Sequence, residues 1–231
     1  NEYYKFDVQT GKKLLPSFIN NAVAICLACS EEYAPFASLV VRSLVEHSCK
    51  NKKYDILVLT TDITRNTQVI LKSCLSNCKN ITLRFVYVNS YIDNMSFFTW
   101  AHFTKNTYFR LLIPDIFSQY EKVLYLDSDV IICNDVMKLL EMDISSYYLG
   151  ACLDTHVVSY CYQANRTDRT YNQKVLGLTD PYCYFQMGVV LFNISKINED
   201  FPSGFLIGLT QKNTFKWLDQ DLLNKVFAGK I

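Results

Sequence analysis

The chain alternates strand-length apolar runs with segments of helical periodicity, and this pattern limits the fold more than any other feature. Residues 21–29 form a nearly continuous apolar run, and Pro35 then opens a segment with apolar residues at helical spacing. Residues 54–59 (YDILVL) are again strand-like, residues 64–78 are helix-like, and residues 81–88 (ITLRFVYV) are rich in strand-favouring residues. The predicted order is therefore strand, helix, strand, helix, strand.

Continuous apolar strands separated by helices are typical of a mainly parallel sheet covered on both faces, which is the doubly wound α/β class. The second half of the chain adds a predicted helix at 107–117, strands at 122–126, 147–153 and 188–192, and a closing helix at 217–227. We therefore expect a single Rossmann-like α/β domain whose mixed, mainly parallel sheet is flanked by helices. In such sheets ligands bind at the carboxyl ends of the strands.

The composition fits one globular domain and argues against nucleic acid as a partner. Half of the 231 residues are hydrophobic, which is enough for a substantial core. The 23 basic residues nearly balance the 22 acidic ones, so the chain has no global field that would attract nucleic acid. Residues 1–20 are interpreted as a polar N-terminal lead and residues 21–231 as the domain.

The number and positions of the cysteines, together with hydropathy, predict the cellular location of the protein. The nine cysteines are an odd number and lie partly inside apolar runs, which favours reduced thiols over a disulfide framework. The sequence has no apolar stretch long enough to cross a bilayer, and residues 1–20 lack a signal-peptide core. We expect a cytoplasmic protein, and peripheral contact with the inner face of the membrane through a tail beyond Ile231 is left open.

An acidic triplet, Asp127-Ser128-Asp129, follows the predicted strand 122–126. If the chain turns after Leu126, both carboxylates can face one divalent cation. Carboxylate oxygens suit Mg²⁺ or Mn²⁺, which keep open positions for phosphate oxygens. The alternative is a polar turn without a ligand. Because the two charges lie between KVLYL and VII, where an apolar turn would be easier to tolerate, we favour the metal site.

Several segments together resemble glycosyltransferase family 8, the retaining enzymes of GT-A fold that include glycogenin and bacterial lipooligosaccharide galactosyltransferases. The acidic triplet lies in KVLYLDSDVII, which is similar to the family signature. The other matches occur in the family order, and they are ACSEEY from residue 28, HFTKNTYFR from residue 102, GACLD from residue 150, YFQMGVV from residue 184 and DQD from residue 219. The resemblance covers the chain from about residue 21 to its end.

The resemblance implies a site for the nucleotide of a UDP-sugar donor. Ala28 leaves room for the base and Tyr33 stacks on uracil, whereas an ordinary core tyrosine is the alternative. Ser30 stands where many relatives carry an acidic residue against the base or ribose, so uridine is implied less firmly than a nucleotide. The acidic triplet would hold the diphosphate, with Asp127 and Asp129 as ligands of Mn²⁺ or Mg²⁺.

The resemblance also implies a pocket for the transferred sugar. Arg110 would reach the sugar and pair with Asp219, since a guanidinium can bridge a hydroxyl and a carboxylate. Asp154, Gln186 and Gln220 would supply further donors and acceptors for sugar hydroxyls. Gln186 replaces the commoner asparagine of the family, which leaves the sugar open. Without the motifs, Arg110 would be interpreted as a surface residue and Gln220 as part of a polar first helical turn.

Retention of the anomeric configuration, which the family implies, leaves two routes. A double displacement needs a protein nucleophile below the anomeric carbon, whereas front-side departure and attack through an oxocarbenium-like ion pair needs none. Gln220 is a poor nucleophile but can steady positive charge. We favour the front-side route, in which the leaving phosphate takes the proton of the acceptor.

Members of the family usually add a histidine metal ligand and a Gly-Lys loop after the DQD segment. The three histidines of this chain, His47, His102 and His156, all precede that segment. His102 and residues near His156 are expected to form the acceptor side of the site, and the remaining metal ligand is expected beyond Ile231.

These features predict a hexosyltransferase that moves a hexosyl group from a UDP-sugar to a glycan, glycolipid or glycoprotein acceptor. One alternative is a metal-dependent nucleotidyltransferase, which also places paired carboxylates after a strand. The other is a non-catalytic module that binds a nucleotide sugar.

Overall fold

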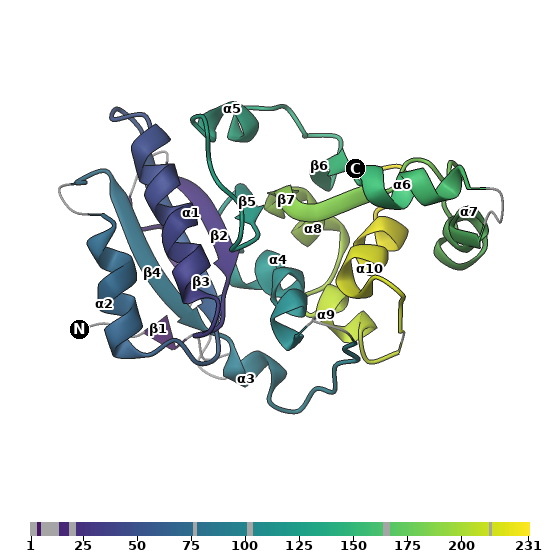
Figure 1. Ribbon diagram of the computed structural model, residues 1–231, viewed down its shortest axis with the longest axis horizontal. Coiled ribbons are helices and arrows are strands. Elements are labelled where there is room, and N and C mark those ends of the chain that lie inside the picture. The colour runs from purple at the N-terminus through teal and green to yellow at the C-terminus, as the bar shows by residue number, and fades with distance from the viewer. Residues whose placement is uncertain are drawn as a thin grey trace.

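The computed structural model describes residues 4–5, 14–18, 22–75, 78–100, 104–163, 167–212 and 214–231. Within these residues the chain forms an α/β domain on one seven-stranded sheet, in the order β1-β4-β3-β2-β5-β7-β6 (Figure 1). The strands are β1 (Tyr4–Lys5), β2 (Ala22–Ala28), β3 (Lys53–Thr60), β4 (Ile81–Tyr87), β5 (Lys122–Leu126), β6 (Leu149–Leu153) and β7 (Phe185–Asn193).

The first five strands in this order run parallel to one another, from β1 through β4, β3 and β2 to β5. β7 pairs antiparallel with β5 on one side and with β6 on the other. The expectation of a mixed, mainly parallel sheet is therefore confirmed.

Helices cover both faces of the sheet, because its central strands are apolar on both sides and need buried partners. On one face α1 (Ala34–His47) lies against β2 and β3, and α2 (Arg65–Ser73) lies beside β4 (Figure 1). On the other face the buried cluster joins the strands to the 3₁₀ helix η1 (Lys105–Leu112), α4 (Ile113–Ile116) and α10 (Leu218–Val226).

The remaining helices are short and lie in the connections. They are α3 (Asn89–Ile92), α5 (Met137–Leu140), α6 (Thr155–Cys161), α7 (Thr167–Tyr171), the π-helix η2 (Asn172–Leu176), α8 (Ile194–Asp200) and α9 (Phe205–Leu209). In the part of the chain that the structure describes, no helix combines the length and hydropathy needed to span a bilayer.

Two local features differ from the sequence pattern. The segment predicted as one helix at 107–117 is a 3₁₀ helix followed by the short α4, which carries Pro114 in its first turn. Along α1, Val40 and Leu44 are buried whereas Phe36 and Leu39 are exposed. A helix turns about 100° per residue, so only the face that contains Val40 and Leu44 reaches the sheet.

A buried carboxylate ties the beginning of the chain to the sheet. Asp55, in β3, is fully buried and pairs with Arg84 at 2.5 Å. It also accepts hydrogen bonds from Ser17 N (3.0 Å), Thr82 Oγ1 (2.8 Å) and Tyr120 OH (2.8 Å). A buried charge is tolerated when several donors and an opposite charge surround it. Residues from four segments distant in sequence therefore meet at this carboxylate.

Replacing the carboxylate should destabilise the fold strongly. We expect Asp55→Ala to lower the free energy of unfolding by about 3–5 kcal/mol, because it removes the charge that pairs with Arg84 and accepts hydrogen bonds from three hydroxyl groups. Urea denaturation followed by circular dichroism measures this loss.

The matched control is Glu46→Ala. It breaks the pair between Arg42 and Glu46, whose side chains are 56% and 52% exposed, and should cost less than about 1 kcal/mol. Equal losses in the two variants would contradict the role given to Asp55.

Candidate functional site

A cavity of about 300 Å³ opens at the carboxyl ends of β2 and β5. These strands are parallel neighbours, with Leu27 beside Leu126, so the segments that follow them meet at one edge of the sheet. Seven residues singled out in the sequence line the cavity together, and they are Ala28, Ser30, Tyr33, Arg110, Asp127, Ser128 and Asp129.

The cavity has four further lining residues that the sequence analysis did not assign. Thr104, Asn106 and Thr107 come from the beginning of η1, and Tyr125 comes from β5. The three residues from η1 fall in the HFTKNTYFR segment, which was the available signal for them. His102 belongs to the same segment but lies outside the described residues.

The wall formed by the segment after β2 is held by the beginning of α2. The Glu31 carboxylate accepts hydrogen bonds from Thr64 N (2.8 Å), Thr64 Oγ1 (3.0 Å) and Thr67 Oγ1 (2.5 Å). The bond from Thr67, followed by those from Thr64, lowers the pKa of Glu31. Tyr33 follows at the first turn of α1 and is 38% exposed, so it is not an ordinary core tyrosine. Its ring is available at the cavity wall.

Another lining residue of the cavity, Asp127, stands close to β7. Its backbone N–H donates to Gly188 O (2.7 Å), and a Cβ added at Gly188 would lie 2.7 Å from Asp127 Oδ2. Asp127 Oδ1 accepts a hydrogen bond from Tyr125 OH (2.8 Å). The Asp127 side chain remains 35% exposed and Asp129 is exposed. Both carboxylates can therefore contact a ligand in the cavity.

Arg110 connects the acidic triplet to α10. Its Nε lies 2.7 Å from Asp219 Oδ2, its Nη2 lies 3.4 Å from Asp127 Oδ1, and its Nη1 donates to Met187 O. The guanidinium also lies 4.8 Å from the centroid of the Tyr125 ring. Burial lowers the pKa of Arg110, but the charges of Asp219 and Asp127 outweigh burial and raise it. Arg110 is thus a permanently charged, buried residue and not a surface arginine.

The Asp219 carboxylate is 1% exposed and retains unused acceptor capacity. It forms the ion pair with Arg110, yet neither of its oxygens meets the geometry of a hydrogen bond to any described residue. Burial raises the pKa of Asp219 to about 7, although Arg110 acts in the opposite direction. A small movement of the ion pair would let this carboxylate accept hydrogen bonds from a ligand.

The other predicted residues lie outside the cavity lining, and two of them, Gln220 and Asp154, contact each other. Gln220 Nε2 donates to Asp154 Oδ2 (2.9 Å), and Gln220 Oε1 accepts from Met187 N (3.1 Å). Gln186 Oε1 accepts from Gly188 N (2.5 Å). Asp154, Gln186, Asp219 and Gln220 thus form a polar layer that meets the cavity through Arg110 and Asp127.

The donor set fits part of a site for a hard cation. Asp127 and Asp129 offer carboxylate oxygens at the edge of the cavity, and such oxygens are ligands of Mg²⁺ and Mn²⁺. Among the residues with described positions, no three or more His, Cys, Asp or Glu side chains are grouped to hold a metal. The two carboxylates could therefore supply only part of a coordination shell, as is usual where phosphate oxygens and water complete it.

Comparisons with known proteins agree with this geometry. A Haemophilus influenzae relative with a glycosyltransferase name is 28% identical over 208 residues, which are 86% of this chain and 57% of that protein. The bifunctional glycosyltransferase WbbM superposes with a TM-score of 0.84 at 30% identity, covering 94% of this chain and 39% of that one. The galactosyltransferase LgtC, crystallised with donor and acceptor sugar analogs, superposes with a TM-score of 0.73 at 25% identity, covering 90% and 72%.

The chain spans about half the length of the curated relatives it matches, 57% and 45% for the first two. The family model described as Glycosyl transferase family 8 matches residues 24–231, which include every residue of the cavity wall and of the polar layer behind it. The chain belongs to glycosyl transferase family 8.

Proposed function

We propose that residues 21–231 form the transferase domain of a retaining hexosyltransferase, which moves a hexosyl group from a UDP-sugar to a glycan, glycolipid or glycoprotein acceptor. One observation carries this proposal. One cavity is lined by an exposed aromatic ring, two accessible carboxylates and a buried arginine that pairs with one of these carboxylates. These groups suit the base, the metal-bound diphosphate and the sugar of such a donor.

The nucleotide is proposed to lie along the β2 side of the cavity. Tyr33 offers its ring for stacking on the base, Ala28 has too small a side chain to obstruct the base, and Ser30 offers a hydroxyl. The hydrogen bonds of Glu31 to the beginning of α2 would keep this wall in place before the donor binds.

The diphosphate is proposed to lie on the acidic triplet, where Asp127 and Asp129 would hold Mn²⁺ or Mg²⁺. A bound cation would offset the negative charge that develops on UDP as it departs. The role of the chain is to hold the two carboxylates at the lining of the cavity. Tyr125 and Arg110 restrain one oxygen of Asp127, which leaves Asp129 exposed for the ligand.

The transferred sugar is proposed to lie against Arg110 and the polar layer behind it. Arg110 and Asp219 together present guanidinium N–H donors and an under-used carboxylate to sugar hydroxyls. Asp154, Gln186 and Gln220 would supply further polar groups behind Arg110 and Asp219. The amide of Gln220 is also the group that we propose to face the positive charge at the anomeric carbon.

Transfer then proceeds on one face of the sugar. The bond between the anomeric carbon and the leaving phosphate oxygen breaks, the bond to the acceptor oxygen forms on the same side, and the acceptor proton passes to the departing phosphate. Asp221 is one of the two carboxylates adjacent to Gln220 in sequence, and both of its oxygens already accept hydrogen bonds. Because both oxygens of Asp221 are engaged in hydrogen bonds, we favour the front-side route over attack by the Asp221 carboxylate.

Purified protein incubated with UDP-sugars and Mn²⁺ tests the function. We expect release of UDP from at least one of UDP-glucose, UDP-galactose and their N-acetyl forms. Release of pyrophosphate from a nucleoside triphosphate would instead identify a nucleotidyltransferase. Metal-dependent binding of UDP without turnover of any donor would identify a binding module.

Removing the exposed carboxylate of the triplet should abolish the metal dependence of nucleotide binding. We expect Asp129→Asn to weaken the Mn²⁺-dependent affinity for UDP by more than about tenfold, or ~1.4 kcal/mol, with little loss of stability because Asp129 is exposed. Isothermal titration of UDP with and without Mn²⁺ gives the result.

The control is Glu121→Gln, which removes an exposed charge at the opposite end of the same strand. It should leave the Mn²⁺-dependent affinity unchanged. The metal assignment is wrong if Asp129→Asn binds UDP as the wild type does.

The close approach of β7 to Asp127 gives a second prediction. In Gly188→Ala the new Cβ would stand 2.7 Å from Asp127 Oδ2 and 3.0 Å from Gln186 Oε1, so the carboxylate must move. We expect the Mn²⁺-dependent affinity for UDP to fall by about 10-fold to 100-fold, as it does when groups that orient a metal ligand are lost.

Gly150→Ala is the matched control, because its Cβ would meet neighbouring atoms at 3.4 Å or more in the adjacent strand β6. Titration of both variants with UDP and Mn²⁺ should give a lower affinity for Gly188→Ala than for Gly150→Ala. Equal affinities would show that the position of Asp127 does not matter for the ligand.

A further inference from the structure

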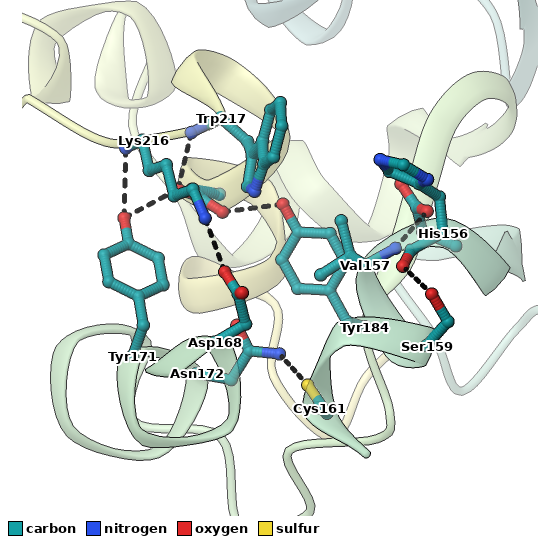
Figure 2. A network of polar contacts seen from close by, with 12 residues as sticks. His156, Val157, Ser159, Cys161, Asp168, Tyr171, Asn172, Tyr184, Lys216 and Trp217 are labelled. Atoms are coloured by element: carbon teal, nitrogen blue, oxygen red, sulfur yellow. Dashed lines mark hydrogen bonds and ion pairs between the residues drawn. The ribbon is translucent and has the colours of Figure 1, made fainter. Parts of the chain in front are cut away.

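We propose that Asp221 is a positioning residue that fixes the orientation of the Gln220 amide, through Tyr184 and through the turn that begins α10. The inference rests on the proposed function, because it concerns how Gln220 is presented to the donor sugar. Figure 2 shows Tyr171, Tyr184 and Trp217 around this network, which links the end of α7, the beginning of β7 and the beginning of α10.

The Asp221 carboxylate is fully buried and both of its oxygens are occupied. Oδ1 accepts a hydrogen bond from Tyr184 OH (2.6 Å), and Oδ2 accepts from Tyr171 OH (2.7 Å) and from Trp217 N (2.8 Å). A fully buried carboxylate without a direct ion pair to a cation is expensive to desolvate. The fold therefore maintains three converging donors around this residue, next to the Gln220 of the sugar pocket.

The first link to Gln220 is the hydroxyl of Tyr184. A phenol has one proton to donate, and Tyr184 donates it to Asp221. Its oxygen must therefore act as the acceptor toward Gln220 Nε2, which lies 3.3 Å away. Because Asp221 takes the hydrogen bond from the phenol, Tyr184 presents a lone pair, and not a proton, to the amide of Gln220.

The partners of Gln220 then leave one orientation for the amide. Asp154 is an acceptor and Tyr184 acts as one, so both must face the NH₂ group. Met187 N is a donor and must face Oε1. A flipped amide would place Nε2 against the Met187 N–H and Oε1 against the Asp154 carboxylate, losing these hydrogen bonds.

The second link is the backbone before α10. Leu218 has a positive φ of 50°, which is unfavourable for a residue with a branched side chain, and it lies between Trp217 and Asp219. The Asp221 carboxylate holds Trp217 N on one side of this residue, while Arg110 holds Asp219 on the other. The turn that directs Asp219 and Gln220 toward the sugar pocket is therefore fastened by Asp221.

These two links predict a specific kinetic signature. Gln220 and Asp219 are proposed to contact the sugar, whereas UDP is proposed to lie on the β2 side of the cavity and on the acidic triplet. Weakening the hydrogen bonds that orient the Gln220 amide should therefore reduce the rate of the chemical step, with little effect on the affinity for the donor.

The test uses Asp221→Asn and Tyr184→Phe, assayed for UDP release from the donor that the wild type accepts. Each variant should lower kcat by about 10-fold to 100-fold, and the KM for the donor should change less than about threefold. The double variant should lose no more than the larger single loss, because both changes break the same connection.

Tyr171→Phe is the matched control. It removes the hydroxyl that donates to Asp221 Oδ2 and accepts from Lys216 N, but it leaves in place the bonds of Asp221 with Tyr184 OH and Trp217 N that form the two links. Its kcat should stay within about threefold of wild type. Equal losses in Tyr171→Phe and Tyr184→Phe, or additive losses in the double variant, would overturn the positioning role and leave a purely structural one. If Asp221→Asn does not fold, the comparison of the two tyrosine variants decides.

A second measurement keeps this inference separate from the proposed function. If the wild type releases no UDP from any donor, the function fails, and the side-chain amide signals of Gln220 in a ¹H–¹⁵N spectrum still report its orientation. These signals should shift and exchange faster with water in Tyr184→Phe and in Asp221→Asn but not in Tyr171→Phe. Unchanged signals in all three variants would overturn the inference.

Discussion

The site depends on the buried ion pair between Arg110 and Asp219. Arg110 sits on a 3₁₀ helix and contacts the carboxylate of Asp219 on α10, the carboxylate of Asp127 after β5, and the backbone of β7. Breaking a buried pair by removing one partner leaves an uncompensated charge, which is far more costly than losing an exposed pair. The positions of three segments distant in sequence are therefore set together. A sugar placed at this point would meet donors and an acceptor that are already ordered.

Two residues near this ion pair, Gly188 and Asp221, hold its neighbours in position. Gly188 lets β7 approach the Asp127 carboxylate, and Asp221 holds the turn that brings Asp219 to the arginine. Neither residue lines the cavity, and both act through a group that is closer to it. Each oxygen of the Asp221 carboxylate has a hydrogen-bond partner, whereas the Asp219 carboxylate has its ion pair with Arg110 and acceptor capacity left for a ligand. Asp129 differs from these residues, because its carboxylate is exposed and the stability of the fold depends little on it.

Much of this could be predicted from the sequence, because its strongest signals are local. The runs of apolar residues gave the parallel strands, and the acidic triplet at the end of KVLYL placed two carboxylates at a strand end. The pairing of Arg110 with Asp219 was implied by the resemblance to glycosyltransferase family 8, and the two residues are in contact. The catalytic roles of Asp154 and Gln220 and the donor-binding role of Gln186 stay predictions, because these residues are not part of the cavity lining.

The remaining features depend on contacts that local patterns do not encode. β1 has only two residues and exists because β4 offers it an edge. Asp55 looks like an interruption of an apolar strand until Ser17, Thr82 and Tyr120 converge on it. Asp221 resembles an acidic residue in a first helical turn, and its three donors come partly from segments about 40 and 50 residues away, since tertiary contacts override local preference.

The most direct measurement of the central claim compares UDP release by the wild type and by Arg110→Lys, with Mn²⁺ and each of several UDP-sugars. Lysine keeps the positive charge but loses the planar fork that contacts Asp219 and the Met187 carbonyl at once. We predict that the wild type releases UDP from at least one donor and that Arg110→Lys is slower by more than about 100-fold. Equal rates in the two proteins, or release of pyrophosphate in place of UDP, would contradict the account.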